Sequence, residues 1–538
     1  MTVTPLPEHL DLGAVASLRA DLAAVGYTVE GVQAALGPVA SAALHREQAL
    51  PALRATAEAD GPAEASTAHA STAHASTADP VDPVDPVDPA DSGSALRLLV
   101  RLFTLGRPVP RAALDRALRQ TTTAGLESLG LVLADDGPGG EVQALLDLRP
   151  YGDEEHTWWV ASDLGEVARG EQLPTHHVLG IGGASATLAS WTPRRRVAHA
   201  LDLGTGCGIQ ALHLASHADQ VVATDISRRA LAIARLNAAL ADQAWDLRHG
   251  DMLAPVAGET FDLVVSNPPF VITPRVAGVP AYDYRDGGRA GDAVVQGLVR
   301  GVGAHLRPGG VAHFLGNWEV RHGETWRDVW QRWLDGTGLD AWVVQRETQD
   351  PAEYAELWVR DGGTSSGPEF ERLYGAWLDD FAARGVARIG FGVVTLQRPA
   401  RERPPWVDLV EVTGPVAAPM GPTIEAGMVA RTWLAEHDDA AVLDTAWRLA
   451  EDVTEERFGR PGAQDPAIIR VRQGGGLGVV RTAGTALAAY LSVADGSLTA
   501  RQALTAIAAL LERDTDEVVA ETLPVIQDLV KDGLLLTP

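Results

Sequence analysis

The sequence contains very little cysteine or lysine, and it has no long uninterrupted run of apolar residues. Cys207 is the single cysteine in 538 residues, which excludes a disulfide within the chain and a cysteine-based zinc site. No stretch approaches the ~18 apolar residues that a membrane span needs. The opening residues, MTVTPLPEHLDLG, lack the basic and apolar segments of a secretory signal. We therefore expect a cytoplasmic protein that has no membrane partner and no metal site.

Positive charge is also scarce. Lys531 is the single lysine, and 44 basic residues stand against 71 acidic ones, a net charge of −27. Proteins that bind duplex nucleic acid over a large area usually present a basic face. The excess of acidic residues therefore disfavours binding to duplex nucleic acid. A local patch remains open through Arg194–Arg196, Arg275, Arg285 and Arg289. Solvated surface charge is the simpler interpretation of each arginine.

The length predicts three or four domains at ~150 residues each, and one boundary is clear. Residues 62–94 contain the repeats STAHA and VDP and have no periodic apolar face. Such a segment buries too little surface to offset the entropy of ordering it. We predict a disordered low-complexity linker there, after an N-terminal helical segment over residues 1–61.

Two further regions flank the middle of the chain. Residues 95–175 contain helical patterns followed by alternating strand patterns, which predicts a small α+β domain. Residues 401–538 end in two helical patterns and a short terminal strand. Both orders suit a winged helix, and they also suit other small α+β folds.

Residues 176–400 have a different pattern. Short apolar runs alternate with helical segments, beginning with VAHALDLG, QVVATDI, WDLRHGD and FDLVVSNPP. Strands that alternate with helices predict an α/β fold, in which helices cover both faces of a mostly parallel sheet.

The clearest motif in this region is a glycine loop. An apolar strand that includes Asp202 leads into Gly204-Thr205-Gly206-Cys207-Gly208, and a helical pattern follows. Glycines suit a tight turn where a ligand approaches the backbone itself. Alone, this motif also fits a dinucleotide site or a plain strand-to-helix turn. Cys207 is most simply a small packing residue.

Polar residues follow at the ends of the next three strands. Asp225 ends the second strand, where a carboxylate can accept hydrogen bonds from both ribose hydroxyls of an adenosine. Asp251 ends the third strand, and Asn267-Pro268-Pro269-Phe270 ends the fourth. Open α/β sheets bind ligands at the carboxyl ends of their strands, so these residues are expected to share one site.

The combination of DLGTGCG, ATDIS, GDM, VVSNPPF and LRPGG resembles class I S-adenosylmethionine (SAM)-dependent methyltransferases. The similarity is to the branch with an N-P-P-[FY] loop, which includes release-factor glutamine methyltransferases and RNA methyltransferases acting on adenine N6 or guanine N2. It covers about residues 176–400. It implies a Rossmann-like, seven-stranded domain that uses SAM, with the small terminal domains on either side.

The resemblance also implies roles for individual residues. Gly204, Gly206 and Gly208 would pass along the methionine and ribose of SAM, Asp225 would hold the ribose, and Asp251 with Met252 would lie by the adenine. The remaining residues assigned to the cofactor site are Asp202, Thr205, Ile226 and, in the stretch VLGIGGASATLASW, Thr187.

The N-P-P-F loop suits methyl transfer to a planar nitrogen. An amide or an exocyclic amine is a poor nucleophile because its lone pair is delocalised, so two acceptors must orient its N–H bonds. In the family these are the Asn side-chain oxygen and the first Pro carbonyl, here Asn267 and Pro268. Two prolines, Pro268 and Pro269, fix the backbone, and Phe270 offers an apolar face for stacking. Without the other motifs, the Pro pair would only end a strand.

The loop selects the atom to be methylated but not the molecule. The excess of acidic residues and the SNPPF motif favour, as the methylated atom, glutamine N5 of a protein such as a translation factor. Phe in place of the family's Tyr, and the flanking domains, keep an rRNA or tRNA base open. A small-molecule amine fits less well, and a SAM-sensing, nucleic-acid-binding regulator has no use for this loop. Tyr282 and Tyr284 either flank the substrate or pack a lid.

Overall fold

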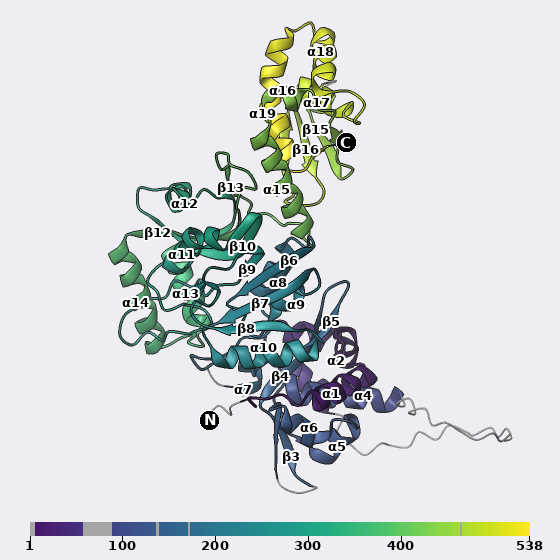
Figure 1. Cartoon of the computed structure of the whole chain (residues 1–538), viewed down its shortest axis with the longest axis vertical. Helices are drawn as coiled ribbons and strands as arrows, with labels where there is room; N and C mark the ends of the chain where they lie inside the picture. The colour runs from purple at the N-terminus through teal and green to yellow at the C-terminus, as the bar shows by residue number, and fades with distance from the viewer. Residues whose placement is uncertain (1–5, 58–88, 136–138, 171–172, 463–464, 538) are drawn as a thin grey trace, which may run out of the picture.

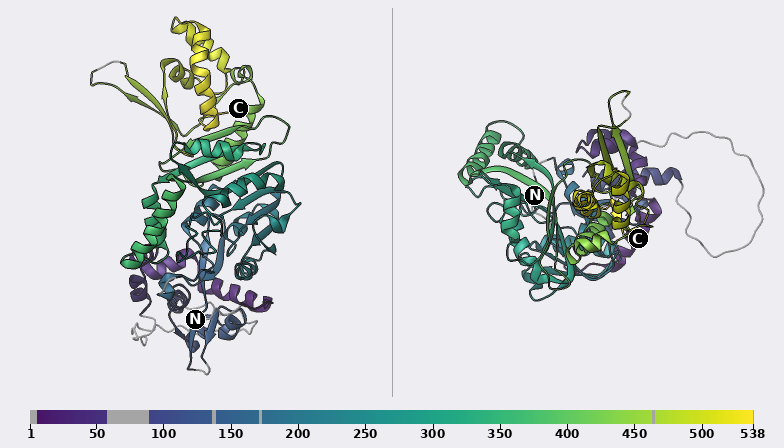
Figure 2. Two further views of the ribbon diagram at one scale, coloured as in Figure 1. Left: turned by 90° about the vertical axis from the view of Figure 1, so that its left-hand side faces the viewer. Right: turned by 90° about the horizontal axis from the view of Figure 1, so that it is seen from above.

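The computed structural model of the chain describes residues 6–57, 89–135, 139–170, 173–462 and 465–537. Its N-terminal, central and C-terminal parts follow one another along the longest axis (Figure 1, Figure 2). Most of the predicted linker, residues 62–88, lies outside the described ranges. The helix α4 (Pro89–Leu99) begins inside the range predicted as linker.

The central part is built on one eight-stranded sheet in the order β13-β11-β12-β10-β9-β6-β7-β8. Every neighbouring pair is parallel except those that β12 makes with β10 and β11. The strands are β6 (Val197–Leu203), β7 (Ala218–Asp225), β8 (Trp245–His249), β9 (Phe261–Ser266), β10 (Leu306–Arg321), β11 (Asp340–Gln349), β12 (Val386–Gln397) and β13 (Val407–Glu411).

This sheet confirms the predicted mostly parallel α/β fold and adds one strand to the seven expected. The added strand, β13, pairs parallel to β11 at the edge of the sheet. It lies beyond residue 400, so the sheet continues past the predicted domain boundary. A half-exposed strand of five residues carries too weak an apolar pattern to be recognised from sequence.

Helices cover both faces of the sheet. On one face α11 (Ala293–Gly301) and α12 (Trp326–Leu334) bury a core with Trp330 and Trp333. The helix α12 follows from its sequence, because Thr325 and Asp328 form a capping box and the apolar residues recur at helical spacing. On the other face lie α8 (Gly183–Trp191), α9 (Ile209–Leu214) and the beginning of α15 (Gly421–Glu436). The helix α10 (Arg228–Leu240) packs between β7, β8 and the N-terminal part.

A helical hairpin is inserted between β11 and β12. Its helices are α13 (Pro351–Asp361) and α14 (Pro368–Arg384). Asp350 starts α13 by accepting hydrogen bonds from the backbone N–H groups of Ala352 and Glu353, at 2.8 and 2.9 Å, and proline occupies the first turn of both helices. The hairpin lies at one side of the sheet (Figure 1), where it reaches the ligand-binding edge.

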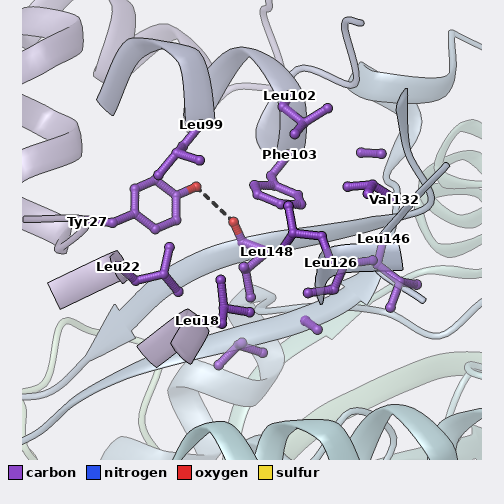
Figure 3. Packing of buried hydrophobic residues seen from close by; sticks show 14 of the residues in the cluster. Leu18, Leu22, Tyr27, Leu99, Leu102, Phe103, Leu126, Val132, Leu146 and Leu148 are labelled. Atoms are coloured by element: carbon purple, nitrogen blue, oxygen red, sulfur yellow. Dashed lines mark hydrogen bonds between the residues drawn. The ribbon is translucent and has the colours of Figure 1, made fainter. Parts of the chain in front are cut away.

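The N-terminal part has one core that joins the first helices to the region after the predicted linker. Leu18 and Leu22 pack with Leu99 and Phe103, and the Tyr27 hydroxyl donates a hydrogen bond to the Leu148 carbonyl at 2.8 Å (Figure 3). The predicted N-terminal segment and the predicted domain over 95–175 therefore share one core. Before β1, the described residues form the helices α1 (Leu12–Val25), α2 (Val29–Leu44), α3 (Leu50–Ala57), α4 and the π-helix η2 (Val100–Thr104).

After η2 the order is strand, helix, helix, strand, strand. These elements are β1 (Val109–Pro110), α5 (Arg111–Ala117), α6 (Thr122–Ser128), β2 (Val132–Ala134) and β3 (Glu141–Ala144), with a sheet order of β1-β3-β2. The antiparallel pair β4 (Leu146–Gly152) and β5 (Thr157–Asp163) and the short α7 (Glu166–Arg169) complete the part. The order agrees with the winged-helix expectation, which stays a prediction.

The C-terminal part has its own core around Trp447 and Tyr490. Its elements after α15 are α16 (Asp439–Leu443), β14 (Arg448–Leu449), β15 (Val453–Phe458), β16 (Ile468–Gln473), β17 (Val480–Ala483), α17 (Thr485–Ser492), α18 (Ala500–Leu510), α19 (Thr515–Lys531) and β18 (Leu535–Leu536). The last three are the predicted helix pair and terminal strand. Within the described ranges, no helix combines the length and apolar character needed to cross a bilayer.

Candidate active site

A cavity of about 500 Å³ lies at the carboxyl ends of β6, β7 and β9. The structure therefore brings most of the predicted residues together. Those that line the cavity are Gly204, Thr205, Gly206, Asp225, Ile226, Asp251, Met252, Asn267 and Pro269. Those that lie outside its lining are Asp202, Gly208, Thr187, Pro268 and Phe270.

The glycine loop leaves room for a ligand against its backbone. Gly204 and Gly206 have φ angles of +73° and +57°, a left-handed conformation that favours glycine. A Cβ built on either would have no neighbour within 4 Å among the described residues. Gly208 serves packing instead, because a Cβ there would lie 2.6 Å from the Trp245 ring.

Two aspartates fix the loop from different sides. Asp202 is 1% exposed, and its Oδ2 accepts hydrogen bonds from Thr205 Oγ1 at 2.6 Å and from the Ala211 N–H at 3.0 Å. Burial raises the pKa of Asp202 to about 7. This predicted cofactor residue is thus a support of the loop beneath the cavity surface.

Asp225 is the carboxylate at the cavity itself. Its two oxygens accept hydrogen bonds from the Gly206 N–H at 2.9 Å and from the Ser227 N–H at 2.7 Å. Burial raises its pKa. Each carboxylate oxygen can accept more than one hydrogen bond, so both can also accept from ligand hydroxyls.

The turn after β8 forms another wall of the cavity. Met252 has a φ of +45°, uncommon for a residue with a side chain. Asp251 Oδ2 accepts a hydrogen bond from Arg289 Nη2 at 3.3 Å. Both Asp251 and Arg289 line the cavity, so one ion pair links this turn to the segment that precedes α11.

The loop predicted to be catalytic, Asn267–Phe270, begins where β9 ends. Asn267 and Pro269 line the cavity, and Asn267 Oδ1 is buried without a hydrogen-bond partner in the described chain. Buried polar atoms nearly always have partners, and the exceptions call for an explanation such as function. Phe270 contributes less directly than predicted, because its partly buried ring packs against three hydrophobic clusters and not into the cavity.

The segment before β6 also contributes, in a different register from the one predicted. Thr187 is exposed on α8, whereas Ser185 lines the cavity. Two residues correspond to about 200° around a helix axis, so Thr187 faces away. The structure therefore places the N-terminus of α8, and not its middle, at the cavity, and Ser185 lies where Thr187 was expected.

Several lining residues escaped the sequence analysis. They include His176, His177, Asp283, Gly287, Gly288 and Asp361, while Arg289 was considered only as part of a basic patch. Gly287-Gly288 was a usable signal, since paired glycines mark close approaches of the backbone. Nothing near Asp361 in the sequence indicated a role, because this residue ends α13 in the inserted hairpin.

Tyr282 and Tyr284 lie in different surroundings. Tyr284 lines the cavity, whereas Tyr282 is 6% exposed and packs under the Arg285 guanidinium, 4.3 Å from its ring centre. Nearby, burial lowers the pKa of His177 to about 4, so this cavity histidine is neutral at pH 7.

The arginines considered for a basic patch all have partners. Arg194 pairs with Asp153 at 2.7 Å, Arg196 with Asp219 at 3.0 Å, and Arg285 with Asp361 at 2.9 Å. The others contact Gly309, Asp286 and Asp251. Arg275 Nε also donates to the Arg289 carbonyl at 3.2 Å, so these two lie together. Five of the six arginines are paired with an aspartate. Cys207 is buried, which raises the pKa of its thiol to about 12, in agreement with a packing role.

Comparison with known proteins gives two family matches, a domain of unknown function (DUF7059) over residues 24–145 and the Methyltransferase small domain over residues 179–325. A release factor glutamine methyltransferase from Moorella thermoacetica is 42% identical over 121 residues, which cover 20% of this chain and 42% of that protein. A ribosomal protein uL3 glutamine methyltransferase from Bradyrhizobium diazoefficiens is 33% identical over 177 residues, which cover 31% and 54%.

The chain spans about half the length of these curated relatives. A solved T. thermophilus 16S rRNA N2 methyltransferase, in complex with AdoMet and guanosine, is 16% identical with a TM-score of 0.26, over 58% of this chain and 71% of that one. That TM-score is too low to add to the assignment. The family match, the curated relatives and the sheet place the central domain of this chain among the class I SAM-dependent methyltransferases.

Proposed function

We propose that the chain is a SAM-dependent N-methyltransferase that modifies glutamine N5 of a cytoplasmic protein, either a translation factor or a ribosomal protein. One observation carries this proposal. Asn267 lines the same cavity as the glycine loop and Asp225, and its Oδ1 is a buried acceptor with no partner among the described residues. A substrate N–H is the partner that this atom lacks.

The residues present fit SAM. Gly204 and Gly206 leave free space against the backbone, and Asp225 can accept hydrogen bonds from two ribose hydroxyls. The volume of about 500 Å³ lies within the ~300–1,000 Å³ typical of small-molecule sites. When bound, SAM supplies the activated methyl group and its own leaving group.

The chain's own contribution is orientation. Asn267 Oδ1, at the cavity wall, accepts one N–H bond of the substrate amide. The resemblance makes the carbonyl of Pro268, a residue directly beside the cavity lining, the acceptor of the other N–H bond. Together the two acceptors point the nitrogen lone pair at the methyl donor. Fixed acceptors of this kind need no reorganisation as charge develops on the nitrogen. Because the prolines restrict the backbone, the Pro268 carbonyl stays in one place.

The charge of the cavity favours a protein substrate over a nucleic acid. Its lining includes Asp225, Asp251, Asp283 and Asp361. The arginine in the lining, Arg289, pairs with Asp251, and Arg285 pairs with Asp361. The net negative charge of the lining therefore comes from Asp225 and Asp283. Phosphate groups are repelled by such a surface, whereas a neutral glutamine side chain is not. The names of the two curated relatives, both glutamine methyltransferases of translation proteins, support the same choice.

The test is to incubate the purified protein with methyl-labelled SAM and an extract of cells that lack its gene. Protein, RNA and DNA are then separated and counted. We expect label in one protein band, recovered as N5-methylglutamine after digestion. Label in RNA would replace the glutamine assignment by base methylation. SAM binding without label in any fraction would instead support the SAM-sensing regulator.

A further inference from the structure

We propose that Tyr354 and Asn317 are positioning residues for methyl transfer, through which the α13–α14 hairpin fixes the catalytic loop. The inference rests on the function proposed above, because it concerns the geometry of the Asn267–Phe270 loop. It assigns a role to the inserted hairpin, which supplies Asp361 to the cavity lining but makes none of the hydrogen bonds described above for Asp202 and Asp225.

The hydroxyl of Tyr354 connects three segments beside the Asn267–Phe270 loop: the helix α13, the strand β10 and the chain around Ile272. Tyr354 of α13 is fully buried, and its Oη accepts hydrogen bonds from the Ile272 N–H and from Asn317 Nδ2, both at 2.9 Å. Asn317 is 1% exposed and belongs to β10, which pairs with β9. Tyr354 therefore ties the hairpin to the sheet and to the chain just beyond Pro269.

The two prolines make this anchor important. Pro268 and Pro269 have no backbone N–H, so neither residue can hold the loop by donating a hydrogen bond. Two donors soon after them are the N–H groups of Val271 and Ile272. Val271 donates to the Arg285 carbonyl at 2.7 Å, and Ile272 donates to Tyr354 Oη. Both acceptors depend on the hairpin, because the Arg285 side chain pairs with Asp361 at the end of α13.

Packing reinforces the same link. Val271 and Ile272 are buried in a cluster with Trp377 and Phe381 of α14, and Phe270 packs against this cluster. Burial also raises the pKa of Tyr354, which keeps the phenol neutral. Removing its oxygen leaves two buried donors, at Ile272 and Asn317, without their acceptor, and this is more damaging than losing a solvent-exposed hydrogen bond.

The first test is Tyr354→Phe, which keeps the ring and removes the hydroxyl. A displacement near 1 Å in a reacting geometry can lower rates by about 100-fold. We expect kcat to fall by ~10–100-fold while the Kd for SAM changes by less than about twofold. The matched control is Tyr490→Phe, since Tyr490 is a buried tyrosine of the C-terminal core whose hydroxyl lacks a partner in the described residues. It should keep wild-type kcat.

A second test does not depend on activity. Hydrogen exchange of the peptide that covers residues 267–273 should become at least about tenfold faster in Tyr354→Phe, while the peptide around residues 203–208 keeps its rate. Asn317→Ala should reproduce the effect, and the double variant should be less impaired than the two single effects combined, because both act on one contact.

The outcomes separate this inference from the proposed function. Unchanged exchange over residues 267–273 in Tyr354→Phe would overturn the positioning role, whether or not a substrate is known. Wild-type kcat in Tyr354→Phe would do the same. Failure of the wild-type protein to methylate any fraction, combined with faster loop exchange in Tyr354→Phe, would overturn the proposed function and leave the structural link standing.

Discussion

The two halves of the cavity are held together in different ways. On the cofactor side, the carboxylates of Asp202 and Asp225 bind partners that are at most 19 residues away in the sequence. Asp202 binds Thr205 and Ala211, and Asp225 binds Gly206 and Ser227. On the substrate side they come from distant segments. Ile272 binds Tyr354, Arg285 pairs with Asp361, and the Asp283 N–H donates to the Thr175 carbonyl at 2.9 Å.

This difference predicts that cofactor affinity and turnover are separable in this protein. Local hydrogen bonds form as the strand-to-helix turns fold, so the cofactor side depends little on the insertion. The substrate side depends on three segments meeting correctly. Changes to the hairpin should therefore affect methyl transfer, whereas changes to the turns should affect SAM binding.

The largest expected effect on SAM binding comes from Gly206→Val. The φ of +57° strains a β-branched residue by about 1–3 kcal/mol, and the new side chain enters the cavity. We expect the Kd for SAM, measured by calorimetry, to rise by about 100-fold or more. Gly258→Val is the control, because Gly258 has a φ of +83° and equal free space away from the cavity. Equal loss of affinity in both variants would contradict a specific role for Gly206.

Asp225→Ala should have the next largest effect. A hydrogen bond to a charged group contributes about 1.5–3 kcal/mol. We expect the net loss to equal one such bond, so SAM affinity should fall by ~10–100-fold. Asp219→Ala, which removes a carboxylate from the exposed Arg196 pair, should bind SAM like the wild type. An Asp225→Ala variant with unchanged affinity would exclude the assigned ribose contact.

A pH-dependent effect is expected at Asp202. Its pKa rises from 3.8 to about 7 in the fold because it is buried, so the folded chain binds this proton more tightly than the unfolded chain. Its contribution to stability is complete below pH 3.8 and is lost as the pH rises through 7. The free energy of unfolding of the wild type relative to Asp202→Asn should fall by on the order of 3 kcal/mol from pH 4 to pH 8.

Urea unfolding of both proteins across this pH range measures that difference. Parallel stability curves would show that Asp202 does not change its protonation on folding. SAM affinity should change far less than in Asp225→Ala, because Asp202 supports the loop from below the cavity surface.

The smallest effect is expected at Thr187. Its side chain is exposed and outside the cavity lining, so Thr187→Ala should change the Kd for SAM by less than about twofold. A loss similar to that of Asp225→Ala would mean that α8 moves when SAM binds and that Thr187 turns toward the ligand.

The same contrast explains how far the sequence could predict the site. Gly204, Asp225 and Asn267 were predictable because each ends a strand with a clear apolar pattern, and the ends of parallel strands meet at one edge of a sheet. The register of α8 was not predictable to within two residues, so the sequence analysis named Thr187, whereas Ser185 lines the cavity. Pattern reasoning is least reliable at the boundaries of elements.

Other features escaped because they depend on tertiary packing. Asp361 and Tyr354 come from a hairpin whose place beside the loop no local pattern reveals. Phe270 was expected to stack on the substrate, but three cores meet at its ring. The strand β13 and the shared core of the N-terminal part also depend on contacts between segments distant in sequence, so composition and periodicity alone placed those boundaries differently.

The most direct test of the central claim is Asn267→Ala, with methyl transfer and SAM binding measured on the same protein. If Asn267 Oδ1 orients the substrate nitrogen, kcat should fall by about 100–1,000-fold while the Kd for SAM stays within about twofold of the wild type. A variant that retains wild-type turnover would contradict the account. A variant that loses SAM binding and turnover together would show that Asn267 acts on the cofactor side and not on the substrate.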